Sequence, residues 1–207
     1  MNYERIKRFF DIMFALLAII IFSPSMIIIA ILIKIKSPEG EILFRQKRIG
    51  INGKIFEVYK FRTMIPNAEE KLQELLKSDE KIREEYLKYR KLKQDHRIIP
   101  FIGAFLRKTG LDELPQFFNV LLGDMSIVGP RPYIVEEFNE VSQEDQKILT
   151  KVKPGITGFW QTLPYRHDTT FEERVKIDKH YIQSKDFFVD CKIILRTVGV
   201  MVRAKGL

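Results

Sequence analysis

Two adjacent carboxylates, Asp112 and Glu113, are the residues of this sequence best suited to chemistry. Pro115 follows them and is tolerated only near the first turn of a helix, so we expect a helix over residues 113–122 to begin close to Asp112, with Asp112 as its N-cap or in its first turn. Both carboxylates would then lie at the positive end of a helix dipole. Simple N-capping explains one aspartate at such a place. A second carboxylate and the preceding Arg107 favour a chemical role.

A pair of this kind suits phosphoryl transfer. An ionised aspartate attacks phosphorus only when the charge of the phosphate is offset, for example by a divalent cation. Mg²⁺ needs only one or two carboxylates together with substrate phosphates and water, so Asp112 and Glu113 are candidate ligands for it. Arg131 lies between Pro130 and Pro132 on a stiff stretch of backbone, and its guanidinium is suited to clamp phosphate oxygens.

Further cations are expected on a β-hairpin. Residues 41–64 are typical of two short strands joined at the turn signal Asn52-Gly53. In the second strand, alternation places Lys60 and Arg62 at the end of an otherwise apolar face. Solvated cations at a sheet edge are the alternative interpretation.

Helices are expected over most of the remaining chain. Residues 67–94 are highly charged and have apolar residues at helical spacing, which predicts a long amphipathic helix, broken near Ser78-Asp79, with a solvated charged face. Its Lys/Arg-rich end also suits anionic lipid headgroups, and segment 187–204 suits either the membrane interface or ordinary core packing. We therefore expect an α+β fold that is mostly helical, with one short β-hairpin and amphipathic interfacial helices.

An uncharged run of 22 residues, from Ile12 to Ile33, is long enough to enter a membrane, since it measures about 33 Å as a helix. On hydropathy alone the run fits a single-pass helix. Ser23 and Pro24 stand in its middle, however, and cations flank both of its ends, so the positive-inside rule gives no direction. These two facts favour a re-entrant helix-break-helix that dips into one leaflet and returns.

The composition limits the class of protein. The 207 residues are 45% hydrophobic and 30% charged, enough for one domain with a sizeable core, and the net charge of +8 suggests an anionic partner. No helix-turn-helix or aromatic–basic RNA-binding pattern is present in the sequence, so we do not expect nucleic acid. The single Cys191 cannot form an internal disulfide. We expect residues 1–37 to form the membrane anchor and residues 38–207 a cytosolic catalytic domain.

Long motifs in this sequence resemble one known family. The resemblance is carried by KRFFDIMFA, SPSMIIIAILIKIKS, FRQKRIGINGKIFEVYKFRTM, LRKTGLDELPQFFNVLLGDMSIVGPRPY and KPGITGFWQ, which together cover most of the chain. These motifs resemble the bacterial sugar transferases, or monotopic phosphoglycosyl transferases, in their minimal catalytic form.

The resemblance implies a membrane enzyme that moves a sugar 1-phosphate from a UDP-sugar to polyprenyl (undecaprenyl) phosphate and releases UMP, the first membrane step of glycan assembly. Asp112 would attack phosphorus to give a covalent aspartyl-phosphosugar intermediate, and Glu113 would help to hold Mg²⁺. The break in the membrane helix would fall at Ser23 and Pro24. The residues expected to contact substrate are Lys60, Arg62, Arg107, Arg131, Asp178 and Asp190.

The resemblance also implies a location and partners. The enzyme would lie on the cytoplasmic face of the bacterial inner membrane, in contact with anionic lipid, and would supply downstream glycosyltransferases. The sugar, the glycan pathway and self-association of the chain are left open. A non-catalytic membrane-surface module is the second class that fits a basic, tethered chain, and such a module would tolerate loss of Asp112.

Overall fold

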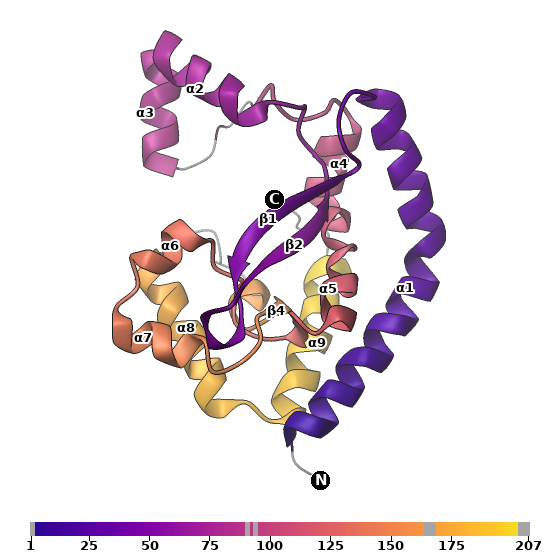
Figure 1. The fold of residues 1–207 in the computed structure, drawn as a ribbon, viewed down its shortest axis with the longest axis vertical. Helices are drawn as coiled ribbons and strands as arrows, with labels where there is room; N and C mark the ends of the chain where they lie inside the picture. Colours follow the sequence, from indigo (N-terminus) through magenta and orange to yellow (C-terminus); the bar gives the residue numbers. More distant parts are fainter. Residues whose placement is uncertain (1–2, 90–91, 93–94, 164–168, 203–207) are drawn as a thin grey trace.

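The structure, a computed structural model, describes residues 3–89, 92, 95–163 and 169–202 (Figure 1). The expected α+β fold is confirmed, because most of the described chain is helical and a short antiparallel hairpin crosses its middle. The ends of two expected helical segments, residues 90–91 and 93–94 of the first and 203–204 of the second, lie outside the described residues.

The described helices are α1 Tyr3–Lys36, α2 Ala68–Ser78, α3 Glu80–Tyr89, α4 Ile102–Thr109, α5 Gln116–Leu122, α6 Val135–Asn139, α7 Gln143–Leu149, α8 Phe171–Ser184 and α9 Phe187–Val202. The strands are β1 Leu43–Ile49, β2 Ile55–Phe61, β3 Ser126–Val128 and β4 Gly155–Thr157, and short 3₁₀ turns occur at η1 Ile51–Gly53, η2 Leu111–Glu113 and η3 Trp160–Thr162. β1 pairs antiparallel with β2, and β3 pairs parallel with β4.

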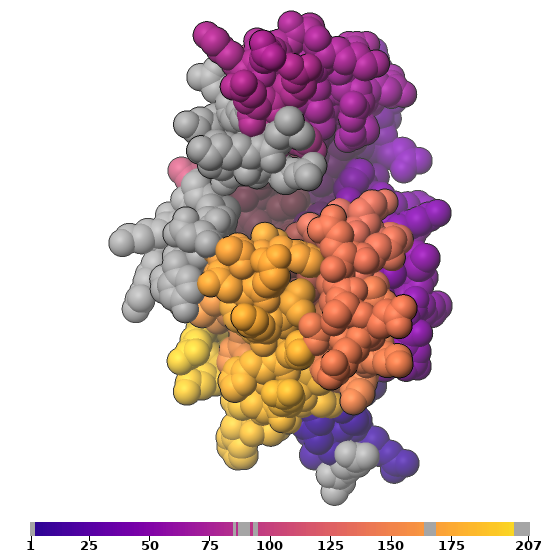
Figure 2. Space-filling view, turned by 90° about the vertical axis from the view of Figure 1, so that its left-hand side faces the viewer, coloured from indigo at the N-terminus to yellow at the C-terminus, as the bar shows by residue number. Residues whose placement is uncertain are grey.

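The elements are arranged around the hairpin. α1 runs along one side of the molecule, and α4 and α5 lie between α1 and the hairpin (Figure 1). α6, α7 and α8 gather at the other side, while α2 and α3 project from the upper end. Figure 2 shows α2 and α3 as a lobe above α6–α8, with an indentation between the two.

α1 is a single helix of 34 residues that contains Pro24, so the expected interruption into two helices at Ser23 and Pro24 is not seen. The Ser23 hydroxyl donates to the Ile20 carbonyl, 2.9 Å away, within the helix. The helix is bowed around the body of the molecule, as expected when a proline removes one backbone hydrogen bond and crowds the preceding turn (Figure 1). By length and composition, α1 can cross a membrane.

Both ends of α1 pack on the body of the molecule. Asp11, Ala15 and Ala18 are buried near its first end, and Ile29 and Ile33 near its second, with none of the intervening residues buried. Ala15 belongs to a core shared with β2, β3, α8 and α9, and the two isoleucines belong to a second core shared with α4 and Leu114. The outer face of α1 carries exposed apolar side chains from Phe9 to Ile35, with charged residues exposed near both ends of the helix.

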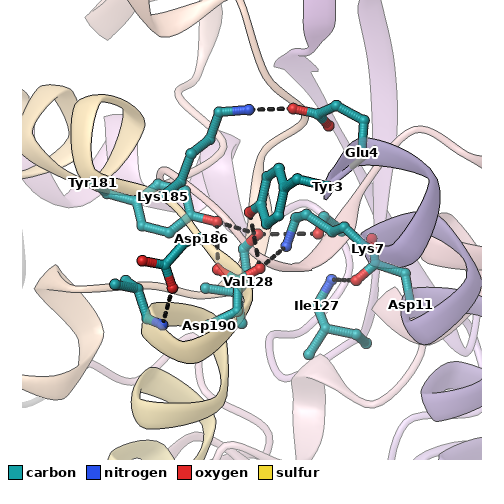
Figure 3. A network of polar contacts seen from close by, with 12 residues as sticks. Tyr3, Glu4, Lys7, Asp11, Ile127, Val128, Tyr181, Lys185, Asp186 and Asp190 are labelled. Atoms are coloured by element: carbon teal, nitrogen blue, oxygen red, sulfur yellow. Dashed lines mark hydrogen bonds and ion pairs between the residues drawn. The ribbon is translucent and has the colours of Figure 1, made fainter. Parts of the chain in front are cut away.

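Polar contacts fix the first turns of α1. Arg8 donates to the carbonyls of Val120 and Leu121 at the C-terminal end of α5, at 2.7 and 3.0 Å. Asp11 accepts from the Ile127 amide at 3.0 Å (Figure 3). Backbone groups at a helix end and a strand edge have few other hydrogen-bond partners. Side chains of α1 therefore satisfy backbone groups of α5 and β3.

The hairpin has the predicted turn, with Asn52 and Gly53 both at positive φ. Phe56 and Val58 of β2 enter the first core, and Phe61 enters the second. The two cores therefore meet along β2, which explains why buried residues of this strand occur on both of its faces.

Asn119 joins α5 to β2. It is fully buried, donates to the Glu57 carbonyl at 2.6 Å and accepts from the Tyr59 amide at 3.0 Å. These two bonds fix the position of the strand end that carries Lys60, the residue next to Tyr59.

The charged stretch breaks where the sequence predicts. α2 ends at Ser78, and the Asp79 carboxylate accepts from the Lys81 and Ile82 amides at the start of α3. Asp79 thus stabilises the start of the second helix as a side-chain cap.

Replacing Asn119 with Ala should destabilise the fold. The substitution leaves the Glu57 carbonyl and the Tyr59 amide without this partner, so we expect the free energy of unfolding to fall by about 2 kcal/mol. The measurement is thermal unfolding in detergent, with an expected loss of roughly 4–8 °C in Tm. Gln73→Ala, on the exposed face of α2, is the control and should leave Tm unchanged. An unchanged Tm for Asn119→Ala would show that the link between α5 and β2 contributes little.

Candidate active site

The two carboxylates lie on a short turn between two helices. Gly110, in the left-handed region at φ +71°, ends α4, and Asp112 and Glu113 follow in the 3₁₀ turn η2. α5 then begins at Gln116 with Pro115 as its N-cap. The expectation that Asp112 caps or opens this α-helix is therefore wrong, because the tighter turn is inserted before it, and Pro115 stands at the helix start instead.

Lys60 of β2 reaches this turn. Its ammonium lies 2.6 Å from Glu113 Oε1, so the structure brings together two of the residues that the sequence singled out. Burial raises the pKa of Asp112 to about 6, and the nearby positive charges of Lys60 and Arg107 oppose that rise. At neutral pH the Asp112 carboxylate is thus mainly ionised, as a nucleophile requires.

Arg48 of β1 is a site residue that the sequence analysis missed. The Ile49 amide donates to the Tyr133 carbonyl at 3.0 Å, which joins the loop of Arg131 to the edge of β1. The Arg48 guanidinium donates to the Pro132 carbonyl at 2.7 Å. Burial and the charge of Arg131 lower the pKa of Arg48 to about 10, whereas the charges of Glu137 and Glu113 oppose the shift. Arg48 therefore contacts the loop that carries Arg131, here called the arginine loop, and its charge also acts on Glu113 of the carboxylate turn, residues 111–113.

Two arginines stack on one tryptophan. The guanidinium carbons of Arg131 and Arg174 lie 5.2 and 5.4 Å from the centroid of the Trp160 ring. The Trp160 Nε1 donates to Thr169 Oγ1 at 2.7 Å, which fixes the ring. Cation–π contact allows both positive charges to be held at the same aromatic side chain.

Three guanidinium nitrogens near this loop remain without a partner. The Nε atoms of Arg48, Arg131 and Arg174 are buried and have no hydrogen-bond acceptor among the described residues. Unpaired buried donors are costly, so an arrangement of this kind suits an anionic ligand that brings acceptor oxygens. Charge alone did not distinguish Arg48 and Arg174 from the many other cations of the sequence, because their position depends on tertiary contacts.

Asp178 positions the arginine loop. Its buried carboxylate accepts from the Tyr133 hydroxyl at 2.7 Å and from the Arg131 amide at 3.2 Å. These contacts orient the backbone of Arg131, and the expected contact of Asp178 with substrate stays a prediction.

Two expected substrate contacts lie in structural networks. Arg62 is buried and donates to the Ser37 hydroxyl and carbonyl, at 2.8 and 2.7 Å, and to the Glu41 carbonyl, so it holds the connection between α1 and β1. Asp190 accepts from Tyr3, Lys7 and Tyr181, at 3.0, 2.7 and 2.8 Å, and so joins α1 to α8 and α9 (Figure 3). A substrate contact for either residue stays a prediction.

Arg107 stays close to that turn. It lies in the last turn of α4 and donates from Nε to Thr63 Oγ1 at 3.0 Å. Its charge is near enough to Asp112 to favour the ionised carboxylate. The structure therefore brings Lys60 and Arg107 to the carboxylate turn.

The carboxylate pair suits a divalent cation that is shared with a substrate. The described residues contain no group of three or more His, Cys, Asp or Glu side chains placed to hold a metal ion. Asp112 and Glu113 supply two partly buried carboxylates, which is the small protein share that Mg²⁺ takes when phosphates and water complete its shell. The donor set thus fits Mg²⁺, with a phosphorylated substrate expected to provide the remaining oxygens.

Comparison with known proteins adds independent evidence. A family model described as "Bacterial sugar transferase" matches residues 2–204. The chain is 40% identical over 200 residues to the exopolysaccharide production protein ExoY of Sinorhizobium fredii. This match covers 97% of this chain and 87% of that protein.

Two other relatives are much longer than this chain. The identity is 42% over 201 residues with the undecaprenyl-phosphate galactose phosphotransferase of Salmonella typhimurium, covering 97% of this chain and 41% of that protein. The identity with the UDP-glucose:undecaprenyl-phosphate glucose-1-phosphate transferase of Escherichia coli is 39% over 199 residues, and the match covers 93% of this chain and 39% of that protein. The chain therefore spans about two fifths of the length of both.

The titration of Asp178 should be visible in the stability of the protein. Burial raises the pKa of Asp178 to about 7, although its hydrogen bonds and the charges of Arg131 and Arg174 oppose the rise. The folded state therefore holds this proton more tightly than the unfolded state does. The resulting stabilisation is complete below about pH 4 and is lost as the pH rises through about 7.

Asp178→Asn keeps an acceptor but cannot ionise, so it serves as the comparison. Between about pH 5 and pH 8, the free energy of unfolding of the wild type should fall by roughly 2–3 kcal/mol relative to that of the variant. Unfolding in urea at a series of pH values measures this difference in the free energy of unfolding. Glu140→Gln, at an exposed site, should show the same pH dependence of stability as the wild type. If the free energies of unfolding of the wild type and Asp178→Asn differed by the same amount at every pH, the assigned titration would be contradicted.

Proposed function

The chain belongs to the bacterial sugar transferase family, and from this premise we propose that it transfers a sugar 1-phosphate from a UDP-sugar to polyprenyl phosphate and releases UMP. The relatives named for undecaprenyl-phosphate sugar transfer support this class of reaction. The observation that carries the proposal is the Asp112–Glu113 turn, with Lys60 bonded to Glu113 and unpaired arginine donors nearby.

In the first step, a carboxylate oxygen of Asp112 attacks the β-phosphorus of the UDP-sugar. The bond from this phosphorus to the bridging oxygen breaks, and UMP leaves with that oxygen and its electron pair. The sugar phosphate is then bonded to Asp112. Lys60 and Arg107 favour the ionised carboxylate before attack, and Arg48 and Arg131 are suited to bind phosphate oxygens.

In the second step, a phosphate oxygen of polyprenyl phosphate attacks the same phosphorus. The bond to Asp112 breaks, the carboxylate is restored, and a polyprenyl diphosphate sugar is formed. Each step exchanges one phosphorus–oxygen bond for another, so neither an oxidant nor a reductant is needed.

Glu113 and Asp112 would hold Mg²⁺ at this site. When bound, Mg²⁺ neutralises part of the charge on the donor phosphates. Lys60 orients Glu113 through its 2.6 Å contact, and the Asp178 carboxylate orients the backbone of Arg131.

The packing of α1 supports an anchor whose two ends lie on the same side of the membrane. The body packs against both ends of the helix, at Ala15 and at Ile33, while the exposed apolar face lies outward. A straight crossing would place those two ends on opposite sides of a bilayer about 30 Å thick. We therefore infer that both ends of α1 lie on the cytoplasmic face of the bacterial inner membrane, beside anionic lipid, and that the product passes to downstream glycosyltransferases.

Loss of the nucleophile tests the reaction. Asp112→Asn should lower UMP release from a UDP-sugar, with Mg²⁺ and polyprenyl phosphate present, by roughly a thousandfold or more, because the amide is a poor nucleophile. Asp124→Asn, on the surface and paired with Lys54, is the matched control and should keep its activity. Intact mass measured with donor alone should show an added phosphosugar on the wild type and none on Asp112→Asn.

Two results would count against the proposal. Turnover retained by Asp112→Asn would remove the nucleophile assignment. A wild type that stays membrane-bound but releases no UMP from any UDP-sugar would favour the non-catalytic membrane-surface module.

The topology of α1 is tested by labelling single cysteines in intact cells. Cys191→Ser provides the background, and Arg5→Cys and Glu39→Cys place an exposed thiol just inside and just after the two ends of α1. If both ends face the cytoplasm, a membrane-impermeant maleimide should label neither position until the cells are permeabilised. Labelling of Arg5→Cys from outside would instead indicate a single-pass helix.

A further inference from the structure

A cationic cavity lies at the first end of α1, apart from the carboxylate turn. Its volume is about 250 Å³, and it is lined by the first turns of α1, by β3, by residues 151–153 and by α8. Five of the lining residues are basic and two are acidic: Lys7, Arg8, Lys151, Lys153 and Lys185 against Glu4 and Asp11. The residues assigned to catalysis do not line it.

The two acidic side chains that line the cavity already have partners within the protein. Glu4 is paired with Lys185, and Asp11 accepts from the Ile127 amide (Figure 3). Lys7 is paired with Asp190, which lies behind the wall. Even with Glu4, Asp11 and Asp190 counted against them, the five basic lining residues leave the cavity with a net positive charge.

Arg8, Lys151 and Lys153 supply that remaining charge. Arg8 donates only to backbone carbonyls of α5 in the contacts described, and neither Lys151 nor Lys153 has an ion pair or hydrogen bond through its ammonium among the described residues. A side-chain carbon at Gly123 would lie 3.6 Å from both Arg8 Nη2 and Lys153 Nζ, so these two cations are close together. Burial and the charge of Arg8 lower the pKa of Lys153, and the charges of Asp11, Asp124 and Glu4 only partly oppose this shift.

The cavity stands where the anchor meets the membrane surface. Arg8 precedes the uncharged run that begins at Ile12, and Phe9 and Leu122 beside it are each about two-thirds exposed. Cations at this level lie among lipid headgroups, where anionic lipids attract them. A volume of about 250 Å³ holds a phosphate group and several waters, since one water occupies about 30 Å³ in the liquid.

We propose that this cavity binds the phosphate group of an anionic phospholipid between Arg8, Lys151 and Lys153, at a site separate from the active site. The lipid is then a structural ligand that ties residues 151–153 to the first turns of α1. The proposal rests on the membrane placement of α1 given above, and it does not depend on the sugar-transfer reaction.

The test uses the full chain in nanodiscs. Wild type is compared in phosphatidylcholine alone, in phosphatidylcholine with one fifth phosphatidylglycerol, and in phosphatidylcholine with millimolar inorganic phosphate, with Tm as the readout. We expect phosphatidylglycerol to raise Tm by several degrees and inorganic phosphate to leave it unchanged. The double variant Lys151→Gln/Lys153→Gln should lose at least half of the rise.

Two control variants separate the site from general charge effects. Lys71→Gln/Lys77→Gln removes the same charge from the exposed side of α2 and should keep the full rise. Lys153→Arg keeps the positive charge and should also keep the full rise in Tm. This variant serves as a second comparison if the double variant folds poorly. UMP release measured on the same samples reports separately on the proposed reaction.

Two results would overturn the proposal. A full rise in Tm for Lys151→Gln/Lys153→Gln would show that the lipid acts elsewhere. A rise with inorganic phosphate equal to that with phosphatidylglycerol would remove the assignment to a lipid.

Discussion

The short helix α5 fixes the long apolar helix α1 relative to the carboxylate turn. Its C-terminal carbonyls accept from Arg8 of α1, and the turn with Asp112 and Glu113 precedes its first residue. Asn119, in its middle, bonds to β2 beside Lys60. A helix of seven residues measures only about 10 Å, so the carboxylates, the cation that contacts them and the anchor are held together by one rigid element.

The distribution of charge divides the polar residues into two groups. Arg62 and Asp190 are almost completely buried and fully engaged with the chain, so their contribution is to join elements. Arg48, Arg131 and Arg174 are held by a strand edge, a loop and an aromatic ring, yet each keeps an unpaired nitrogen. If an anion bound here, it would meet guanidinium groups that are already oriented, which would lower the entropic cost of ordering them.

Local features of the chain were predictable from the sequence, and distant pairings were not. The hairpin turn at Asn52-Gly53 and the break at Asp79 follow from short-range stereochemistry and from unusual local composition. The functional role of Asp112 and Glu113 stays a prediction, and the structure places both carboxylates on one short turn. The start of α5 was placed too early, because a proline marks a helix start only to within a turn.

The structural contacts of Arg62 and Asp190 could not be predicted from the sequence, for one physical reason. A charged residue in a promising motif has many possible partners, and only the folded chain decides whether backbone carbonyls or a ligand receive its hydrogen bonds. Asn119 and Arg48 were overlooked for the same reason, since their partners are 60 to 84 residues away in the chain.

The projecting pair α2 and α3 has a consequence for how such a chain diversifies. Leu72 is its one buried residue among those whose side chains are described, so little of the core depends on it. Insertions or deletions between Asn67 and Asp95 would change the reach of this arm while the hairpin and the carboxylate turn stayed in register. Evolution can thus remodel the outline of the molecule here at small energetic cost.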